Sequence, residues 1–475
     1  MKKKTIMKKK TILKSVALCI AAVMAVGAVS GCSNSGSDKD NQGRTIVSVG
    51  NWPSKEGTEL DTFNARKATF EENNKDVVIE PDTWAFELKT FYAKAAGGQL
   101  PTVYLTHYTE MPQIMEAGYS ADITDALSNR GYDGKFNQQI LDVVSKDGRV
   151  YAFPYEAYVL GLACNTELME AAGLMEEDGT PKQPKDWYEL ADFAVKIKEA
   201  TGKPGFVFPS SGNNGGWIFM PVAWSFGVDF MEQDETGAWK ATFNTPEAAA
   251  ALQYIKDLKW KYDVLPSNTL IDGTEYYKTF ATGNAGILIA AGDIPRRLTQ
   301  YGMTPDKVGM MAMPEGPQRY VTLLGGNVYC ISNEATEDQI DASLRWIETT
   351  SSYSATNDYK VNTDKDINTK LEEGQLIGIK SMSPWSEQAE SLTYLNNLID
   401  EKANSNPNHV KLYNEFVENC PAEIQAEEPV CAQELYGILD SCIQEVMTDE
   451  NADCAAILEK ANSDFQQNYL DNLDF

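Results

Sequence analysis

The spacing of apolar and polar positions predicts that strands and helices alternate at the start of the folded chain. Three short β-rich runs are separated by two stretches with helical periodicity. In order, these are Thr45–Val49, a stretch with Leu60, Phe63 and Phe70 on one face, Val77–Glu80, Glu87–Ala96 and Thr102–Thr106. Strands that alternate with helices in this way predict βαβ units and a mostly parallel sheet.

A second α/β segment begins near Gly161. Within it, Asp186 has the position of a helix N-cap, with Glu189 three residues later. The glycine-rich run Gly212–Trp217 predicts a loop that approaches another group closely. From Glu387 onward the pattern is helical, and Leu395, Leu398 and Leu412 are expected to face inward.

The N-terminal residues have the pattern of a secretory signal. Met1–Lys14 contains seven lysines and no acid, and an apolar run leads to Val29-Ser30-Gly31-Cys32. That run is shorter than the roughly 20 residues that a membrane-spanning helix needs. The last four residues resemble the lipobox of bacterial lipoproteins, which implies a signal peptide over 1–31 and an acylated Cys32. An ordinary signal peptide with a chance cysteine is the alternative, and either Met1 or Met7 is the start.

Residues 32–44 are polar and are expected to form a flexible tether from the lipid. The whole chain has 475 residues, enough for two or more lobes with separate cores, and a formal net charge of −28. So acidic a surface repels phosphate backbones and anionic lipid, which argues against nucleic-acid binding and polybasic membrane docking.

The cysteine and histidine pattern predicts no metal site. After Cys32 the cysteines are Cys164, Cys330, Cys420, Cys431, Cys442 and Cys454. None forms a CxxC pair, and the chain has two histidines, so a zinc site is not expected. The last four cysteines either pair as disulfides after export or are small buried residues in C-terminal helices. No cofactor motif is present.

Aromatic residues recur where predicted strands end. The three segments are Gly50-Asn51-Trp52, Pro81-Asp82-Thr83-Trp84 and Thr106-His107-Tyr108. In parallel sheets, ligands bind beyond the carboxyl ends of the strands. One tryptophan after a strand is usually packing, but recurrence at three ends favours a binding site.

Several ordered blocks carry a family resemblance. Asp147–Tyr155 and Gly161–Leu174 resemble the extracellular solute-binding proteins of ABC sugar importers, the maltose-binding-protein-like family. Further similar blocks are Pro184–Leu190, Phe280–Ile287, Met313–Pro317 and Gly325–Ser332. The resemblance runs from about Thr45 to the end.

This resemblance implies a type II periplasmic-binding-protein-like α/β fold. Two lobes, each a mostly parallel sheet flanked by helices, would close over a ligand in the cleft between them. The chain would cross near Phe153–Tyr155 and Leu323–Gly326, where proline and a glycine pair suit a hinge. The N-terminal lobe would comprise 45–152 and 326–378, and the C-terminal lobe 156–322 and 380–475.

The chain departs from the family pattern at Gly292-Asp293-Ile294, where many relatives have Gly-x-Trp. An aromatic platform is missing there, and Asp293 either accepts hydrogen bonds from hydroxyls or is balanced by Arg296 or Arg297. Aromatic rings suit the apolar faces of sugars, and polar groups suit their hydroxyls. The expected stacking residues are Trp52, Trp84, Tyr108, Tyr155, Trp217 and Trp385, and the polar ones are Asn51, Glu156, Asp293 and Asn327. Glu156 is equally a solvated hinge charge, and Asn327 a residue serving its own turn.

The sequence therefore predicts a monomeric, lipid-anchored receptor on the extracellular face of the cell membrane. It would capture a carbohydrate, expected to be an oligosaccharide, and deliver it to an ABC transporter permease. Two alternatives stay open: a non-sugar solute such as a polyamine or peptide in the same scaffold, or a secreted carbohydrate-active enzyme. Such an enzyme needs a carboxylate pair, and no short motif singles one out. Asp364–Asn368 begins like a calcium loop but lacks its glycine and final glutamate.

Overall fold

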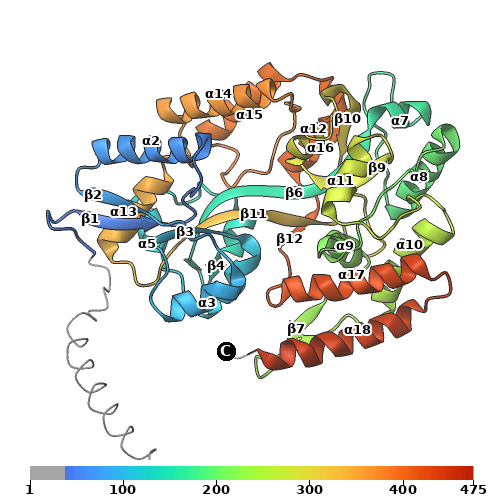
Figure 1. Ribbon diagram of the computed structural model, residues 1–475, viewed down its shortest axis with the longest axis horizontal. Helices are drawn as coiled ribbons and strands as arrows, with labels where there is room; N and C mark the ends of the chain where they lie inside the picture. Colours follow the sequence, from blue (N-terminus) through green and yellow to red (C-terminus); the bar gives the residue numbers. More distant parts are fainter. Residues whose placement is uncertain (1–37, 474–475) are drawn as a thin grey trace, which may run out of the picture.

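The computed structural model describes residues 38–473, which form two α/β lobes side by side (Figure 1). The signal peptide predicted over 1–31, the lipid anchor at Cys32 and tether residues 32–37 lie outside these residues. Over 38–473, every helix is too short or too polar to cross a bilayer.

The predicted strand–helix alternation of the first lobe is confirmed. Its elements are β1 (Thr45–Val49), α2 (Thr58–Asn73), β2 (Val77–Pro81), α3 (Leu88–Ala96) and β3 (Val103–His107). β1 is the central strand, parallel to β2 on one side and to β3 on the other. Short elements follow: η1 (Tyr108–Glu110), α4 (Met111–Glu116), α5 (Thr124–Asn129), α6 (Gln138–Val143), β4 (Ser145–Lys146) and β5 (Arg149–Val150).

Two long strands run through both lobes (Figure 1). They are β6 (Phe153–Asn165) and β11 (Val321–Ile331), which pair in antiparallel fashion. The end of β11 pairs with β3 of the first lobe, whereas its start pairs with β12 (Glu423–Gln425) of the second. The end of β6 pairs with β9 (Ile287–Ala291) and β10 (Val308–Met311). The two strands begin at or near the predicted crossings.

The sheet is mixed rather than mostly parallel. Parallel pairing is found for β1 with β2, β1 with β3 and β11 with β12. β6 is antiparallel to β11 because the chain leaves the first lobe along β6 and returns along β11. β6 is also antiparallel to β9 and β10 of the second lobe. The two-lobed α/β architecture was predicted correctly, but the strand directions around β6 were not.

The glycine pair on β11 is required by close packing of the two crossing strands. A Cβ on Gly325 would lie 2.2 Å from the ring of Tyr158 on β6. Gly326 has φ 135°, and its Cβ would lie 2.0 Å from the carbonyl oxygen of Glu156. Both positions therefore exclude side chains, whatever rotation the crossing also allows.

Helices cover the second lobe. They are α7 (Thr166–Ala171), α8 (Trp187–Thr201), α9 (Asn214–Ser225), α10 (Pro246–Trp260), α11 (Gly273–Ala281), α12 (Ile294–Thr299), α16 (Lys411–Asn419), α17 (Ala432–Thr448) and α18 (Cys454–Asn468), with a hairpin of β7 (Met231–Gln233) and β8 (Trp239–Ala241). As predicted, Asp186 caps α8 by accepting a hydrogen bond of 2.8 Å from the Glu189 amide. All six cysteines after Cys32 are free thiols.

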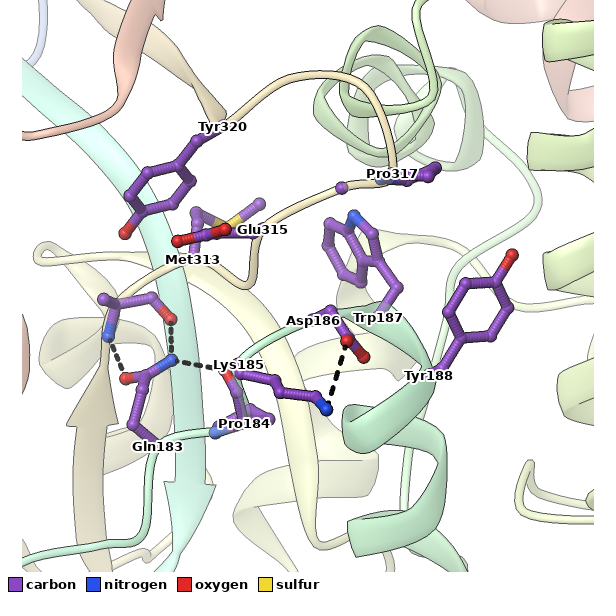
Figure 2. A pocket seen from close by; sticks show the side chains of 12 residues that line it. Gln183, Pro184, Lys185, Asp186, Trp187, Tyr188, Met313, Glu315, Pro317 and Tyr320 are labelled. Carbon is purple, nitrogen blue, oxygen red and sulfur yellow. Dashed lines mark hydrogen bonds and ion pairs between the residues drawn. The ribbon is translucent and has the colours of Figure 1, made fainter.

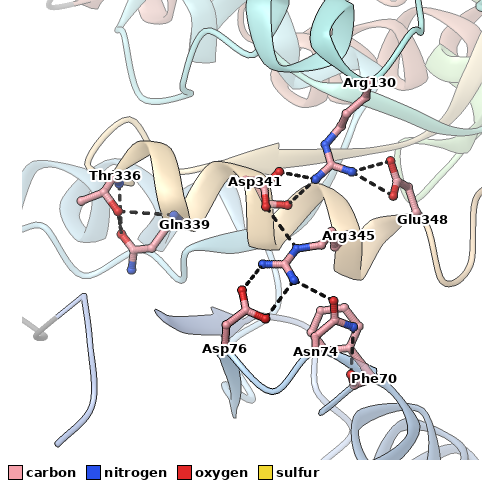
Figure 3. Close-up of polar contacts among 9 residues, drawn as sticks. All are labelled: Phe70, Asn74, Asp76, Arg130, Thr336, Gln339, Asp341, Arg345 and Glu348. Atoms are coloured by element: carbon pink, nitrogen blue, oxygen red, sulfur yellow. Dashed lines mark hydrogen bonds and ion pairs between the residues drawn. The ribbon is translucent and has the colours of Figure 1, made fainter. Parts of the chain in front are cut away.

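An ion-pair network ties α13 (Glu337–Ile347) to other elements of the first lobe (Figure 3). Both Oε atoms of Glu348 lie 3.0 Å from Nη1 of Arg130, and Nη2 of Arg345 lies 2.7 Å from Oδ2 of Asp76.

Residues 38–44, expected to belong to the tether, instead form a hydrogen-bonded turn around Asp40. Local hydrogen bonds to Asp40 and an ion pair of 2.6 Å between Lys39 and Asp338 hold these polar residues.

The segment after residue 380 does not pack with the second lobe alone. Trp385 and Ala389, assigned by sequence to the second lobe, are buried in one cluster with Phe136 and Phe153 of the first. A boundary at 378–380 therefore does not separate the two cores. The predicted C-terminal helices are present, starting with α15 (Glu390–Lys402) after α14 (Asn357–Glu372).

Candidate functional site

Two predicted stacking residues are core residues instead. Trp52 is 4% exposed and stacks on Trp346, with ring centroids 6.0 Å apart, while Phe63 meets its ring edge-on. Trp385 is 7% exposed and stacks on Phe136 at 4.7 Å. The prediction that these rings face a ligand is wrong for this conformation, because other aromatic rings already cover them.

Asn51 and Tyr108 are also used inside the fold. Asn51 turns the chain at the end of β1 with φ 58°, and its side-chain oxygen accepts a hydrogen bond of 3.1 Å from the Leu105 amide. Tyr108 is 1% exposed, and its hydroxyl has no hydrogen-bond partner among residues 38–473. Burial, helped by the nearby charge of Glu156, raises the pKa of Tyr108 above its ordinary value. These two predicted ligand contacts are therefore not supported.

A polar row crosses three adjacent strands where the lobes meet. Asn327 on β11 lies opposite His107 on β3 and Glu156 on β6. The Asn327 amide donates to Glu156 at 2.9 Å, so its oxygen faces His107 Nδ1, also at 2.9 Å. Because an amide oxygen only accepts, Nδ1 of His107 carries the proton. Glu156 and His107 are exposed, so the row is open to solvent.

Tyr155 packs away from this row. The register between β6 and β11 shifts here, leaving Tyr155 without a partner residue on β11, and the Tyr155 ring packs on Tyr329 with centroids 4.8 Å apart. Burial raises the pKa of Tyr155 above its ordinary value. Sequence reasoning placed Tyr155 and Glu156 in one site, but the Tyr155 ring is occupied by packing on Tyr329.

Trp84 remains available on the first lobe. Its ring is half-buried between Phe86 and Tyr104, and the Lys94 ammonium lies 5.7 Å from its centroid. Its indole N–H donates to Thr90 at 3.3 Å. This tryptophan therefore keeps a partly exposed face beyond the end of β2.

On the second lobe, Asp293 has a basic neighbour, one of the two outcomes expected from sequence. Arg297 lies 3.7 Å from Asp293, and its guanidinium also lies over the Tyr277 ring at 5.0 Å. Both charged side chains are exposed, so the pair is weak and available to an incoming polar group. Tyr158 lies close by, and burial raises its pKa above the ordinary value.

The glycine-rich run before Trp217 approaches a helix. A Cβ on Gly216 would lie 2.4 Å from the Tyr436 carbonyl oxygen of α17. Asp440 of the same helix accepts hydrogen bonds from the amides of Asn213 and Gly216 at 2.7 and 2.8 Å. The predicted close approach is present, but its partner is α17.

Trp217 itself is half-buried and meets a carboxylate that sequence reasoning missed. Its indole N–H donates to one oxygen of Glu427 at 2.5 Å, and the Thr109 hydroxyl donates to the other at 2.5 Å. Nearby Glu110 is 9% exposed, and its pKa is raised to about 7 by burial and by the charges of Glu427 and Glu434. No local sequence pattern distinguishes Glu427 as a site residue, because it is one of several acidic residues near the link between β12 and α17.

A pocket of about 450 Å³ lies elsewhere, within the second lobe (Figure 2). Its wall is formed by the start of α8 and the loop that precedes β11, and its lining residues include Gln183, Lys185, Trp187, Met313, Glu315 and Tyr320. None of the predicted site residues lines it. Over 38–473, no group of three or more His, Cys, Asp or Glu side chains could hold a metal ion.

Two lobes joined by continuous strands, with polar and aromatic groups where they meet, define a two-lobed binding-protein fold. The family model described as "Bacterial extracellular solute-binding protein" matches residues 55–349, more than half of the chain. The chain belongs to this family.

Curated relatives are distant. The chain is 26% identical over 260 residues to YcjN of Escherichia coli (strain K12), a match covering 52% of this chain and 56% of YcjN. It is 23% identical to the maltodextrin-binding protein MdxE of Bacillus subtilis (strain 168), covering 72% of this chain and 79% of MdxE. The matches to YcjN and to the sn-glycerol-3-phosphate-binding protein UgpB of Escherichia coli (strain K12) span less than two thirds of those proteins, 56% and 61%.

Solved structures confirm the fold. The cyclic alpha-maltosyl-1,6-maltose binding protein of Arthrobacter globiformis matches with a TM-score of 0.62 at 22% identity, covering 89% of this chain and 98% of that one. UgpB of Mycobacterium tuberculosis, in complex with glycerophosphocholine, matches with a TM-score of 0.62 at 16% identity, covering 89% and 98%. At such identities the likeness concerns the fold.

Proposed function

We propose that this protein is a lipid-anchored extracellular receptor that captures a carbohydrate between its lobes and delivers it to an ABC transporter permease. The solute is an oligosaccharide, held by hydrogen bonds to hydroxyls and by stacking on rings. No bond of the solute changes, and the protein acts as a monomer. Two of the similar proteins are named for maltodextrin and for a cyclic maltose derivative.

One observation carries this proposal: the open polar row at the junction of the two lobes. Asn327 hydrogen-bonds Glu156 and His107 across the strands that join the lobes. Amide, carboxylate and imidazole groups in fixed positions suit the directional hydroxyls of a sugar. Trp84 of the first lobe and Trp217 of the second supply aromatic faces.

A ligand screen tests the proposal. The protein without residues 1–32 is heated with mono- and oligosaccharides, polyamines, amino acids and short peptides. A solute at 100 times its Kd adds about 2.7 kcal/mol of stability. A shift with oligosaccharides supports the proposal, whereas a shift only with amines or peptides refutes it for carbohydrate. Recovery of the sugar in altered form would instead establish an enzyme.

The site assignment has its own test. Trp84→Ala and Trp217→Ala should each weaken calorimetric affinity for the oligosaccharide by more than about 1 kcal/mol, since each removes a stacking face. Asn327→Ala should weaken it as well. Unchanged affinity in all three variants would mean that the solute binds elsewhere. Lipid anchoring is tested by Cys32→Ala, which should release the protein from cells into the medium.

A second candidate, a cationic solute, rests on a specific observation. Glu110, Glu427 and Glu434 lie near one another at the lobe junction. The negative charges of Glu427 and Glu434 help to raise the pKa of Glu110, so like charges meet at this place. A protonated amine would relieve their repulsion. The polyamines in the screen distinguish this candidate from a neutral sugar.

A further inference from the structure

Glu427 lies between the lobes and accepts one hydrogen bond from each. Thr109, in η1 of the first lobe, donates to Oε2 at 2.5 Å, and Trp217, in α9 of the second, donates to Oε1 at 2.5 Å. Both partners are half-buried. Because hydrogen bonds to a charged acceptor are strong and directional, this carboxylate fixes the indole plane of Trp217 relative to the first lobe.

The surroundings of Glu427 contain other titratable groups. Tyr158 of β6 and Tyr436 of α17 lie close to it. Glu110 of η1 faces Glu427, Glu434 and Tyr436 of α17, and Tyr92 of α3. Glu427 accepts its hydrogen bonds from a hydroxyl and an indole group. Losing a donor to this half-buried carboxylate destabilises the state that contained the hydrogen bond.

We propose that Glu427 is a positioning residue that couples the Trp217 ring to the closure of the two lobes. The inference deepens the proposed function, since it concerns the same junction. When the lobes close, the Thr109 hydroxyl forms its hydrogen bond to Glu427. This restricts the Trp217 ring, which is already hydrogen-bonded to Glu427. When they open, the Thr109 bond is lost and the ring loosens.

Closure should also take up a proton. Closing brings Glu427 toward Glu110, and burial together with the charges of Glu427 and Glu434 raises the pKa of Glu110 to about 7. A group whose pKa is higher in the closed state favours that state at low pH. The closed form is therefore favoured below pH 7 and loses this advantage as the pH rises through 7.

Hydrogen–deuterium exchange of the solute-free protein tests the coupling. Thr109→Val removes the first-lobe donor and keeps the shape of the side chain. We expect amide exchange to rise roughly tenfold in residues 426–432 on the opposite lobe, the size of effect that loss of one charge-assisted hydrogen bond produces. Trp217→Phe should in turn raise exchange in residues 105–111 of the first lobe. Glu423→Gln, an exposed carboxylate on the same segment, is the matched control and should change neither.

An effect confined to the mutated lobe would overturn the proposal, because a purely local role of Thr109 or Trp217 moves only its own segment. Glu427→Gln provides a second test, since its amide can still bond both partners but carries no charge. It should retain low exchange in both segments and show a weaker difference between pH 6 and pH 8 than the wild type. Equal pH dependence in the two proteins would also overturn the proposal. Because these experiments use no solute, a failed sugar screen leaves them unaffected.

Discussion

Trp52→Ala distinguishes a core role from a binding role at the end of β1. Sequence reasoning placed this ring against a ligand, whereas in the structure it is 4% exposed, stacks on Trp346 and meets Phe63 edge-on. The Arg66 guanidinium covers the Trp346 ring at 3.9 Å, so the stack is three groups deep. Replacing Trp52 with alanine should leave a cavity within the first lobe.

The expected magnitude follows from burial. Truncating a buried tryptophan to alanine costs about 3–5 kcal/mol. For a cooperative unit of 150–250 residues, this lowers Tm by roughly 6–20 °C. Trp52→Phe keeps a ring in the stack and should cost less. Trp84→Ala, at a half-exposed position, should lower stability by about 1 kcal/mol or less.

Calorimetric thermal unfolding and solute titration measured together provide the assay. Titration well below the Tm of each variant should show unchanged affinity in Trp52→Ala, and weakened affinity in Trp84→Ala. If Trp52→Ala kept the wild-type Tm within about 2 °C and lost solute binding, the core assignment would be refuted. The ring would then belong to the binding site in another conformation.

Further outcomes are expected from single positions. Gly325→Ala should lower the free energy of unfolding, measured with denaturant, by about 1–3 kcal/mol, because its Cβ would meet the Tyr158 ring. Adding Tyr158→Ala to this variant should recover part of the loss. If the costs of the two substitutions simply add, the clash is contradicted. Burial raises the pKa of Glu428 to about 7, so stability should be greater at pH 6 than at pH 8, and Glu428→Gln should flatten that difference. Arg130→Met should lower the free energy of unfolding by roughly 1 kcal/mol at low salt and by less in 1 M salt, because the Arg130–Glu348 ion pair is partly exposed to solvent. A protein that starts at residue 38 should have the same Tm with and without a reducing agent. Thiol titration of the unfolded protein should find six free cysteines, and a smaller number would reveal a disulfide.

Local patterns predicted the elements and their order. The alternation of β1, α2, β2, α3 and β3, and the N-cap at Asp186, depend on residues a few positions apart. Ordered family blocks predicted the two-lobed fold and the starts of the crossing strands. The strand–helix order and the N-cap follow from periodicity and capping, which each segment carries in its own residues, whereas the two-lobed fold was implied by the family resemblance.

The candidate site was predicted less well. Trp84, Trp217, Glu156, Asp293 and Asn327 keep partly or fully exposed polar or aromatic groups. The other predicted contacts were buried or turned away by partners from distant segments. Exposure depends on what packs against a residue, and the sequence around a tryptophan does not name that neighbour.

The sequence by itself determined the strand–helix order of the first lobe, the family and the acidic surface of this protein, but not the start of α9 at Asn214 within the predicted loop Gly212–Trp217. Only the tertiary structure decided that Trp385 lies in the first lobe, that α17 occupies the close approach at Gly216, and that Glu427 joins Thr109 to Trp217. These contacts join residues more than 200 positions apart. Local propensity acts over a few residues, whereas such contacts exist only once the strands have crossed between the lobes and the helices have packed.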